Sequence, residues 1–300
     1  MKYIVSVLIL GSIVLFTSCG NNSKSKNTSS KQKNITNKVD EVVNQLQRSI
    51  TSYKLVASLD HHRMAAEAGV YTPPSVATIF SDTKVDIALV QENQLAGLDM
   101  PFKILCYSEP DTLDVKVAYT SAEFIQQRHN LDPSLLQDYK LKTEKVLDIF
   151  PKEMISNTNL NSVHEGFGII SIKSDFDFPT TVSRLKETIM AQGDTKWFAD
   201  VNYQKKASNM GVTIRPNILL LFGGPAPGGK AMMTSPKIGL DAFCQKLLVY
   251  EKANGEVWIS YNDIISFAEL YYNKSTKPQQ MINQRLNMTF TKSVSMKTEE

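Results

Sequence analysis

The sequence predicts an α+β fold of two similar domains, each a mostly antiparallel sheet with helices packed on one face. Three observations lead to this prediction: an internal repeat, alternating strand and helix patterns within each copy, and a suitable length. The chain has 300 residues with 42% hydrophobic content, which is enough for two ordinary domains.

The internal repeat sets the number of domains before any element is assigned. Residues 60–80 read DHHRMAAEAGVYTPPSVATIF and residues 202–222 read NYQKKASNMGVTIRPNILLLF, with identical Ala, Gly, Val, Pro and Phe at one constant offset. The same offset relates Gly97-Leu98-Asp99 to Gly239-Leu240-Asp241. The sequence therefore predicts two repeat domains and their flanking segments: a first domain at 38–150, a linker at 151–166, a second domain at 167–292 and a tail at 293–300.

The second copy begins with a strand and an amphipathic helix. Residues 168–172 alternate as a strand, and Pro179 opens a helix with Val182, Leu185 and Ile189 on one face. Residues 197–201 are predicted as a second strand, followed by a short helix.

The remaining elements complete an antiparallel sheet. Residues 218–222 are a continuous apolar run, which is typical of a buried central strand. Residues 247–250 and 257–261 flank Asn254-Gly255, a strong hairpin signal. Helical tails are predicted at 133–150 and 278–290.

The first residues resemble the signal peptide of a bacterial lipoprotein. Lys2 precedes a short apolar run that ends at Phe16, and Thr17-Ser18-Cys19-Gly20 resembles a lipobox. Residues 1–18 would then be the signal peptide and Cys19 the site of lipidation, carrying acyl chains such as palmitate. Phe16 departs from the usual Leu, Val or Ile at that place, so ordinary secretion is the alternative. The expected location is the cell envelope, anchored to a membrane through lipid and facing the periplasm or the exterior.

Residues 19–37 are rich in Asn, Ser and Lys, with no acid, which predicts a flexible tether. The net charge of +3 lies largely there, so the folded part is close to neutral and no nucleic-acid partner is expected. Cys106 and Cys244 lie in apolar runs. They are interpreted as buried thiols, and a disulfide between them stays an alternative.

A known family shares this pattern. Phe222-Gly223-Gly224-Pro225, Ile238-Gly239-Leu240-Asp241 and Val257–Tyr261 together resemble the domain-of-unknown-function 302 family. The first copy resembles it more distantly, because it lacks the glycine-proline turn after Phe80. The resemblance implies a compact α+β domain that pairs with another copy, so we expect the two repeats to pair within the chain as a pseudo-dimer. It implies no established reaction.

His61, Asp99 and Asp241 are the candidate ligand-binding residues. Each also has a structural interpretation. For His61, at the start of a helix, it is a capping or surface role, and for Asp99 and Asp241 it is a cap, since an aspartate before a strand or short helix usually caps it. Adjacent histidines point about 100° apart on a helix and cannot chelate one ion alone, so no metal site is predicted. His129 and His164 are expected to be solvated. The cofactor, if there is one, is not identified by the sequence.

The leading functional hypothesis is a non-enzymatic, lipid-anchored envelope protein that binds a small molecule or a partner protein through its tandem repeats. The reason is a doubled domain without a recognisable catalytic set. The alternative is an envelope enzyme, or a redox- or metal-linked factor, with a pocket near His61, Asp99 or Asp241.

Overall fold

The computed structural model describes residues 22–296. The predicted signal peptide (1–18) and the lipidation site Cys19 lie outside the described residues, so they stay predictions.

Ten strands form two five-stranded sheets in the described part of the chain. The first sheet has the order β1-β2-β3-β4-β5 and consists of β1 (Lys54–Asp60), β2 (Ser75–Ser81), β3 (Phe102–Tyr107), β4 (Lys116–Tyr119) and β5 (Ile155–Ser156). The second has the order β6-β10-β9-β8-β7 and consists of β6 (Ile169–Lys173), β7 (Lys196–Asn202), β8 (Asn217–Gly223), β9 (Gln245–Glu251) and β10 (Val257–Asn262). All strand pairs are antiparallel except β4 with β5. The predicted fold class is confirmed.

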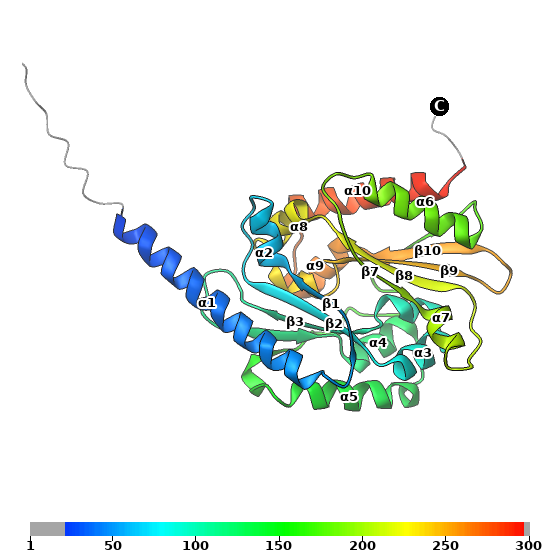
Figure 1. Cartoon of the computed structure of the whole chain (residues 1–300), viewed down its shortest axis with the longest axis horizontal. Helices are drawn as coiled ribbons and strands as arrows, with labels where there is room; N and C mark the ends of the chain where they lie inside the picture. Colours follow the sequence, from blue (N-terminus) through cyan, green and yellow to red (C-terminus); the bar gives the residue numbers. More distant parts are fainter. Residues whose placement is uncertain (1–21, 297–300) are drawn as a thin grey trace, which may run out of the picture.

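The helices follow the same order in both repeats. The first repeat has α1 (Asn22–Ser49), α2 (His61–Glu67), α3 (Thr83–Glu92), η1 (Gln94–Leu98), α4 (Ala122–His129), η2 (Pro133–Leu136) and α5 (Gln137–Leu147). The segment η3 (Lys152–Met154) follows, and the second repeat has α6 (Phe178–Met190), α7 (Tyr203–Ser208), α8 (Pro225–Met232), η4 (Pro236–Leu240), α9 (Ile264–Tyr272) and α10 (Lys277–Val294). Figure 1 shows α6 and α10 on one side of the molecule and α1 and α5 on the other, with both sheets between them.

Each sheet is buried on both faces, which explains its continuous apolar strands. In β8, Ile218, Leu220 and Phe222 belong to the core beneath α6 and α10, whereas Leu219 and Leu221 belong to the core of the first repeat. The predicted buried strand at 218–222 is therefore present, although β9 and not β8 is the middle strand of the sheet.

The two repeats pair through reciprocal contacts. The segment η1 of the first repeat packs on β8 and β9, and the equivalent η4 of the second packs on β2 and β3. Helix α2 contacts α8, and α3 contacts α7. Gly229 allows the first of these approaches, since a Cβ there would lie 2.6 Å from the Cβ of Ala65. The chain is therefore an intramolecular pseudo-dimer, with β1 and β7 close together across the seam.

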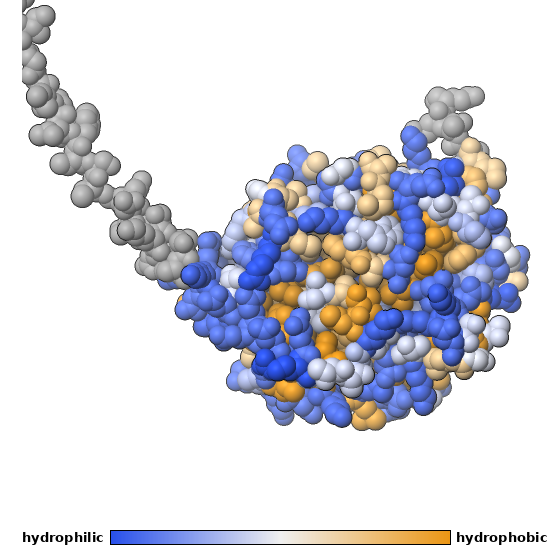
Figure 2. All heavy atoms as spheres, viewed as in Figure 1, coloured by the Kyte–Doolittle hydropathy of each residue, from blue (hydrophilic) through white to orange (hydrophobic). Residues whose placement is uncertain are grey.

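The predicted tether at residues 19–37 is wrong where the structure describes it, because α1 begins at Asn22. Ile35, Val39, Val43, Leu46 and Ile50 recur every three or four residues and are buried in the core of the first repeat. The composition of this segment alone would not stabilise a helix, and the packing of its apolar face does so instead. Figure 2 shows the hydrophilic surface that α1 turns away from the body.

Part of the predicted linker at residues 151–166 belongs to the sheet of the first domain. Its Ile155 and Ser156 form β5, which pairs in parallel with Val117 and Ala118 of β4. In the second sheet, β6 takes the equivalent place beside β10, with Ser171 opposite Ser260. The first repeat has α1 where a counterpart of β6 would lie in the sequence, so its sheet is completed by the connecting segment.

Candidate functional site

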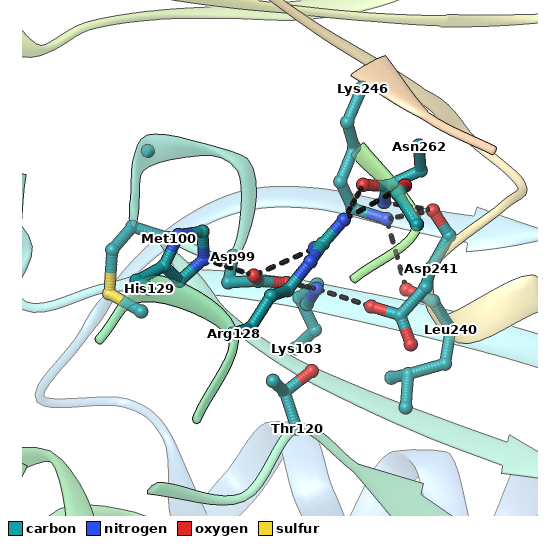
Figure 3. Close-up of polar contacts among 12 residues, drawn as sticks. Asp99, Met100, Lys103, Thr120, Arg128, His129, Leu240, Asp241, Lys246 and Asn262 are labelled. Atoms are coloured by element: carbon teal, nitrogen blue, oxygen red, sulfur yellow. Dashed lines mark hydrogen bonds and ion pairs between the residues drawn. The ribbon is translucent and has the colours of Figure 1, made fainter. Parts of the chain in front are cut away.

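A cluster of charged and polar side chains is buried where the two repeats meet. We call it the central polar cluster; its members are Asp99, Lys103, Arg128, His129, Asp241, Lys246 and Asn262, all at most 3% exposed. Figure 3 shows that they point toward one another from both repeats. Burial of this many charges requires ion pairing, since an isolated buried charge is costly.

Lys103 on β3 bridges the aspartates of the two repeats. Its Nζ lies 3.0 Å from Oδ1 of Asp99 and 2.5 Å from Oδ1 of Asp241. Burial opposes the charged form of both acids, but Arg128 and Lys103 outweigh it and hold the pKa of Asp99 well below its usual value. The ammonium groups of Lys103 and Lys246 likewise lower the pKa of Asp241. Both carboxyl groups are therefore charged at neutral pH.

Arg128 on α4 connects the first repeat to the second. Its Nη1 donates to Oδ2 of Asp99 at 2.8 Å, and its Nη2 donates to Oδ1 of Asn262 at 2.7 Å. The carbonyl oxygens of Phe167 and Gly168 accept from Nε and Nη2 at 2.8 and 3.2 Å. The guanidinium group is thus enclosed by oxygen acceptors.

His129 is buried, and the prediction of a solvated side chain is wrong. Its Nε2 lies 2.7 Å from Oδ2 of Asp99. Burial lowers the pKa of His129 despite the nearby carboxylate, so the neutral ring donates from Nε2. Tyr271 has the equivalent role in the second repeat, where its hydroxyl donates to Oδ2 of Asp241 at 2.5 Å. His164 is exposed, as the sequence predicts.

Lys246 and Asn262 complete the cluster. Lys246 Nζ donates to the carbonyl oxygens of Leu240 and Asp241, each at 3.0 Å. Burial, with Lys103 adding to it, lowers the pKa of Lys246 to about 8. Asn262 Nδ2 donates to the same Asp241 carbonyl at 2.8 Å.

A cavity of about 220 Å³, which we call the inter-repeat cavity, reaches the edge of this cluster. Its lining comes from both repeats and comprises Tyr119, Thr120, Ser121, Glu123, Phe124, Asn157, Thr158, Leu160, Asp241 and Tyr271. The Oγ1 atom of Thr120 is buried without a hydrogen-bond partner, and Figure 3 draws the residue without a dashed line. A buried polar atom usually has a partner, and the described structure supplies none to this hydroxyl.

His61 lies in a different place. Both structural interpretations of this residue, as a helix cap and as a surface residue, are wrong. Asp60 and not His61 caps α2, and His61 is buried against the second repeat. Its Nε2 lies 3.1 Å from the Phe243 carbonyl oxygen, and burial lowers its pKa to about 4. The adjoining cavity, of about 30 Å³, holds little more than a single water. Tyr203, the equivalent residue of the second repeat, donates to the Met100 carbonyl oxygen at 2.7 Å.

The capping interpretation of Asp99 and Asp241 is also wrong. These residues follow the last turns of η1 and η4, where no free backbone N–H groups need an acceptor, and their side chains form ion pairs instead. Asp241 lines the inter-repeat cavity, and Asp99 is enclosed by the cluster. The structure does not place Asp99, Asp241 and His61 in one pocket.

The two cysteines of the described chain, Cys106 and Cys244, are buried and free. Burial raises the pKa of the Cys106 thiol to about 12, and it also raises that of Cys244. Within residues 22–296, no three of the His, Cys, Asp and Glu side chains converge as a metal ion would require.

A second, larger hollow of about 950 Å³ lies between residues 90–95 of the first repeat and the strands β9 and β10. It carries charges of both signs, including Arg215 and Glu251. Lys252 lies over the ring of Trp258, with Nζ 3.8 Å from its centroid. These features do not select one ligand chemistry.

The fold and the cluster define a tandem protein in which two α+β domains share a buried polar interface. The chain belongs to the family described as "Domain of unknown function DUF302", whose model matches residues 31–150 and 170–290. Both repeats are therefore members, and the family description names no reaction.

Two kinds of relative are similar to parts of the chain. A stretch of 96 residues, 32% of this chain, is 28% identical to the fluoride-specific ion channels FluC 1 of Brucella suis biovar 1 and Brucella abortus biovar 1. The match covers only 37% and 35% of those channels. The crystal structure of an uncharacterised conserved DUF302 protein from Bacillus stearothermophilus has 16% identity and a TM-score of 0.35, covering 42% of this chain and 95% of its own. Among the described helices, none combines the length and apolarity needed to cross a membrane.

The cluster predicts a steep loss of stability in acid. The folded-state pKa values of Asp99 and Asp241 lie below the unfolded value, which is about 3.9. Their contribution is therefore complete above that value and is lost as the pH falls through the folded pKa values, because the unfolded chain binds the protons first. Urea unfolding should show midpoints that fall steeply below about pH 4. A midpoint that stays constant from pH 5 to pH 3 would contradict the assignment.

Proposed function

We propose that this chain is a lipid-anchored protein of the cell envelope that binds a small polar molecule in the inter-repeat cavity. The observation that carries the proposal is a cavity of about 220 Å³ whose lining comes from both repeats and is rich in polar side chains, among them Ser121, Asn157 and Thr158. The charged Asp241 and the hydroxyl of Tyr271 lie in the same lining, so the walls offer hydrogen-bonding groups at fixed positions. Such convergent polar groups within a mostly formed cavity are typical of a small-molecule site.

The anchoring part of the proposal rests on Cys19 and the apolar run before it. Full-length protein expressed in a bacterial host and labelled with an alkyne analogue of palmitate should carry the label. Cys19→Ala should lose it and leave the membrane fraction. Equal labelling of both proteins would contradict lipidation at this residue.

The binding part is tested by thermal shift and calorimetry on the full-length protein in detergent. The probes are methylguanidine, N-methylurea, glycerol and sodium fluoride, and we expect at least one of the organic probes to raise the melting temperature. Fluoride is included because the channel relatives are named for it. We expect no response to it, because Asp241 and Glu123 in the lining would repel an anion. No response to any organic probe would contradict the proposed function.

A further inference from the structure

The N-terminal half of α1 extends beyond the body of the protein, as Figure 1 shows. Ile35 is buried in the core, and the four residues before it, 31–34, are exposed. We call residues 22–34 the basic stem; at roughly 1.5 Å per residue it is about 20 Å long. Because the same helix continues into the core, the stem stands in a fixed direction and can reach a flat surface that the body does not touch.

The basic stem carries charge of one sign and no apolar side chain. It reads NSKSKNTSSKQKN, with four lysines and no acid. A helix that lies in the interface of a membrane needs an apolar face to bury there, and the stem has no residues for one. Attraction of the stem to a surface is therefore electrostatic.

The rest of the first repeat has the opposite charge. Residues 35–150 carry 16 acidic and 11 basic side chains, a net charge of −5, whereas residues 151–296 carry 12 acidic and 16 basic side chains, a net charge of +4. An anionic surface would therefore repel the repeat on which α1 packs and attract the stem that projects from it. The positive second repeat is the other part that such a surface would attract, so the test has to separate the two.

The first lysines of the stem stand close to the predicted lipidation site. Cys19 precedes Asn22, the first residue of α1, by three positions. Lys24 and Lys26 follow within about 6 Å along the helix axis, which is less than the Debye length of about 10 Å in roughly 0.1 M salt. Each lysine this close to an anionic membrane strengthens binding about fivefold.

We propose that the basic stem binds the anionic headgroups of a phospholipid membrane, as a second membrane contact beside the acyl anchor. Its lysines supply the attraction, and the acidic first repeat stays away from the surface. The inference goes beyond the proposed anchor at Cys19, because the stem binds an anionic membrane with or without an acyl group.

The test uses the full chain with Cys19→Ala, which has no acyl group at this position, and measures its co-sedimentation with vesicles. One set of vesicles is phosphatidylcholine alone, and the other also contains phosphatidylglycerol. Binding to the first set reports the apolar run before residue 19, which contributes equally to both. We expect phosphatidylglycerol to strengthen binding at least tenfold in dilute salt. Salt at about 0.5 M should remove this preference, because it shortens the Debye length, and it should also release Cys19→Ala from cell membranes.

A stem variant removes the four charges. It combines Lys24→Gln, Lys26→Gln, Lys31→Gln and Lys33→Gln. Glutamine has nearly the helix propensity of lysine, so α1 is kept. We expect this variant to lose at least tenfold in binding to the phosphatidylglycerol vesicles.

The matched control changes the net charge equally in the second repeat, at four exposed lysines. It combines Lys230→Gln, Lys274→Gln, Lys277→Gln and Lys292→Gln. The control should keep the preference for phosphatidylglycerol, because these lysines lie outside the stem.

Equal losses in the two variants would show that the net charge or the second repeat binds the membrane, and would overturn the stem as the site. An unchanged preference in the stem variant would overturn it as well. Tighter binding to a single-stranded DNA oligonucleotide than to the phosphatidylglycerol vesicles would overturn lipid as the partner. A wild-type protein without an acyl label at Cys19 would contradict the anchor alone, since the protein in this test carries no acyl group there.

Discussion

Lys103→Met should lower the free energy of unfolding by about 3–5 kcal/mol, because it leaves two buried carboxylates without the cation between them. Lys103 is the group that contacts Asp99 and Asp241 at once, and its side chain is 2% exposed. Methionine keeps most of the volume, so the loss reports the charge and not a cavity. Urea unfolding followed by the fluorescence of Trp197 and Trp258 measures it, one tryptophan lying in each of two strands of the second sheet.

Lys140→Met is the matched control. Lys140 pairs with Glu123 at 2.8 Å, but both side chains are almost half exposed. A solvated pair of this kind contributes about 1 kcal/mol or less. Equal effects of the two substitutions would mean that the bridge between the aspartates does not stabilise the interface.

Leu46→Ala should cost about 2–5 kcal/mol, because it removes a fully buried side chain of α1 from the core of the first repeat. The size of the effect distinguishes a helix that belongs to the domain from a segment that only connects it to a membrane. Chemical denaturation with an unchanged slope and a lower midpoint would show a change of stability alone.

Gln47→Ala, at an exposed position next to it on the same helix, should change the stability by less than about 0.5 kcal/mol. If Leu46→Ala is as mild as this control, α1 does not pack on the body as described.

The elements inside each repeat could be predicted because their signals are local. The apolar run at 218–222 predicts a buried strand and Asn254-Gly255 predicts a hairpin, each from only a few residues. The structure has β8 and the β9–β10 turn at these places. The start of α1 could not be predicted in this way. Residues 20–34 carry almost no apolar side chains, and the packing that stabilises the helix begins only at Ile35.

The central polar cluster was missed because its contacts are distant in the sequence and cross between the repeats. Lys103 and Asp241 are paired although 138 positions separate them. A signal was nevertheless present: Lys103 and Lys246 stand at matching places in apolar strands, each shortly after a Gly-Leu-Asp step. A lysine inside such a run implies a buried partner, and the nearby aspartates could have supplied it. Arg128 had no such signal, because its counterpart is Leu270.

That difference between Arg128 and Leu270 depends on both repeats being in one polypeptide. Two identical subunits related by a two-fold axis must carry the same side chain at both symmetry-related positions. Joining the halves covalently removes this constraint. One repeat can then keep a side chain that holds the two repeats together, while the equivalent position of the other repeat changes independently. An exchange of arginine for leucine that would alter both sites of a homodimer alters a single site here.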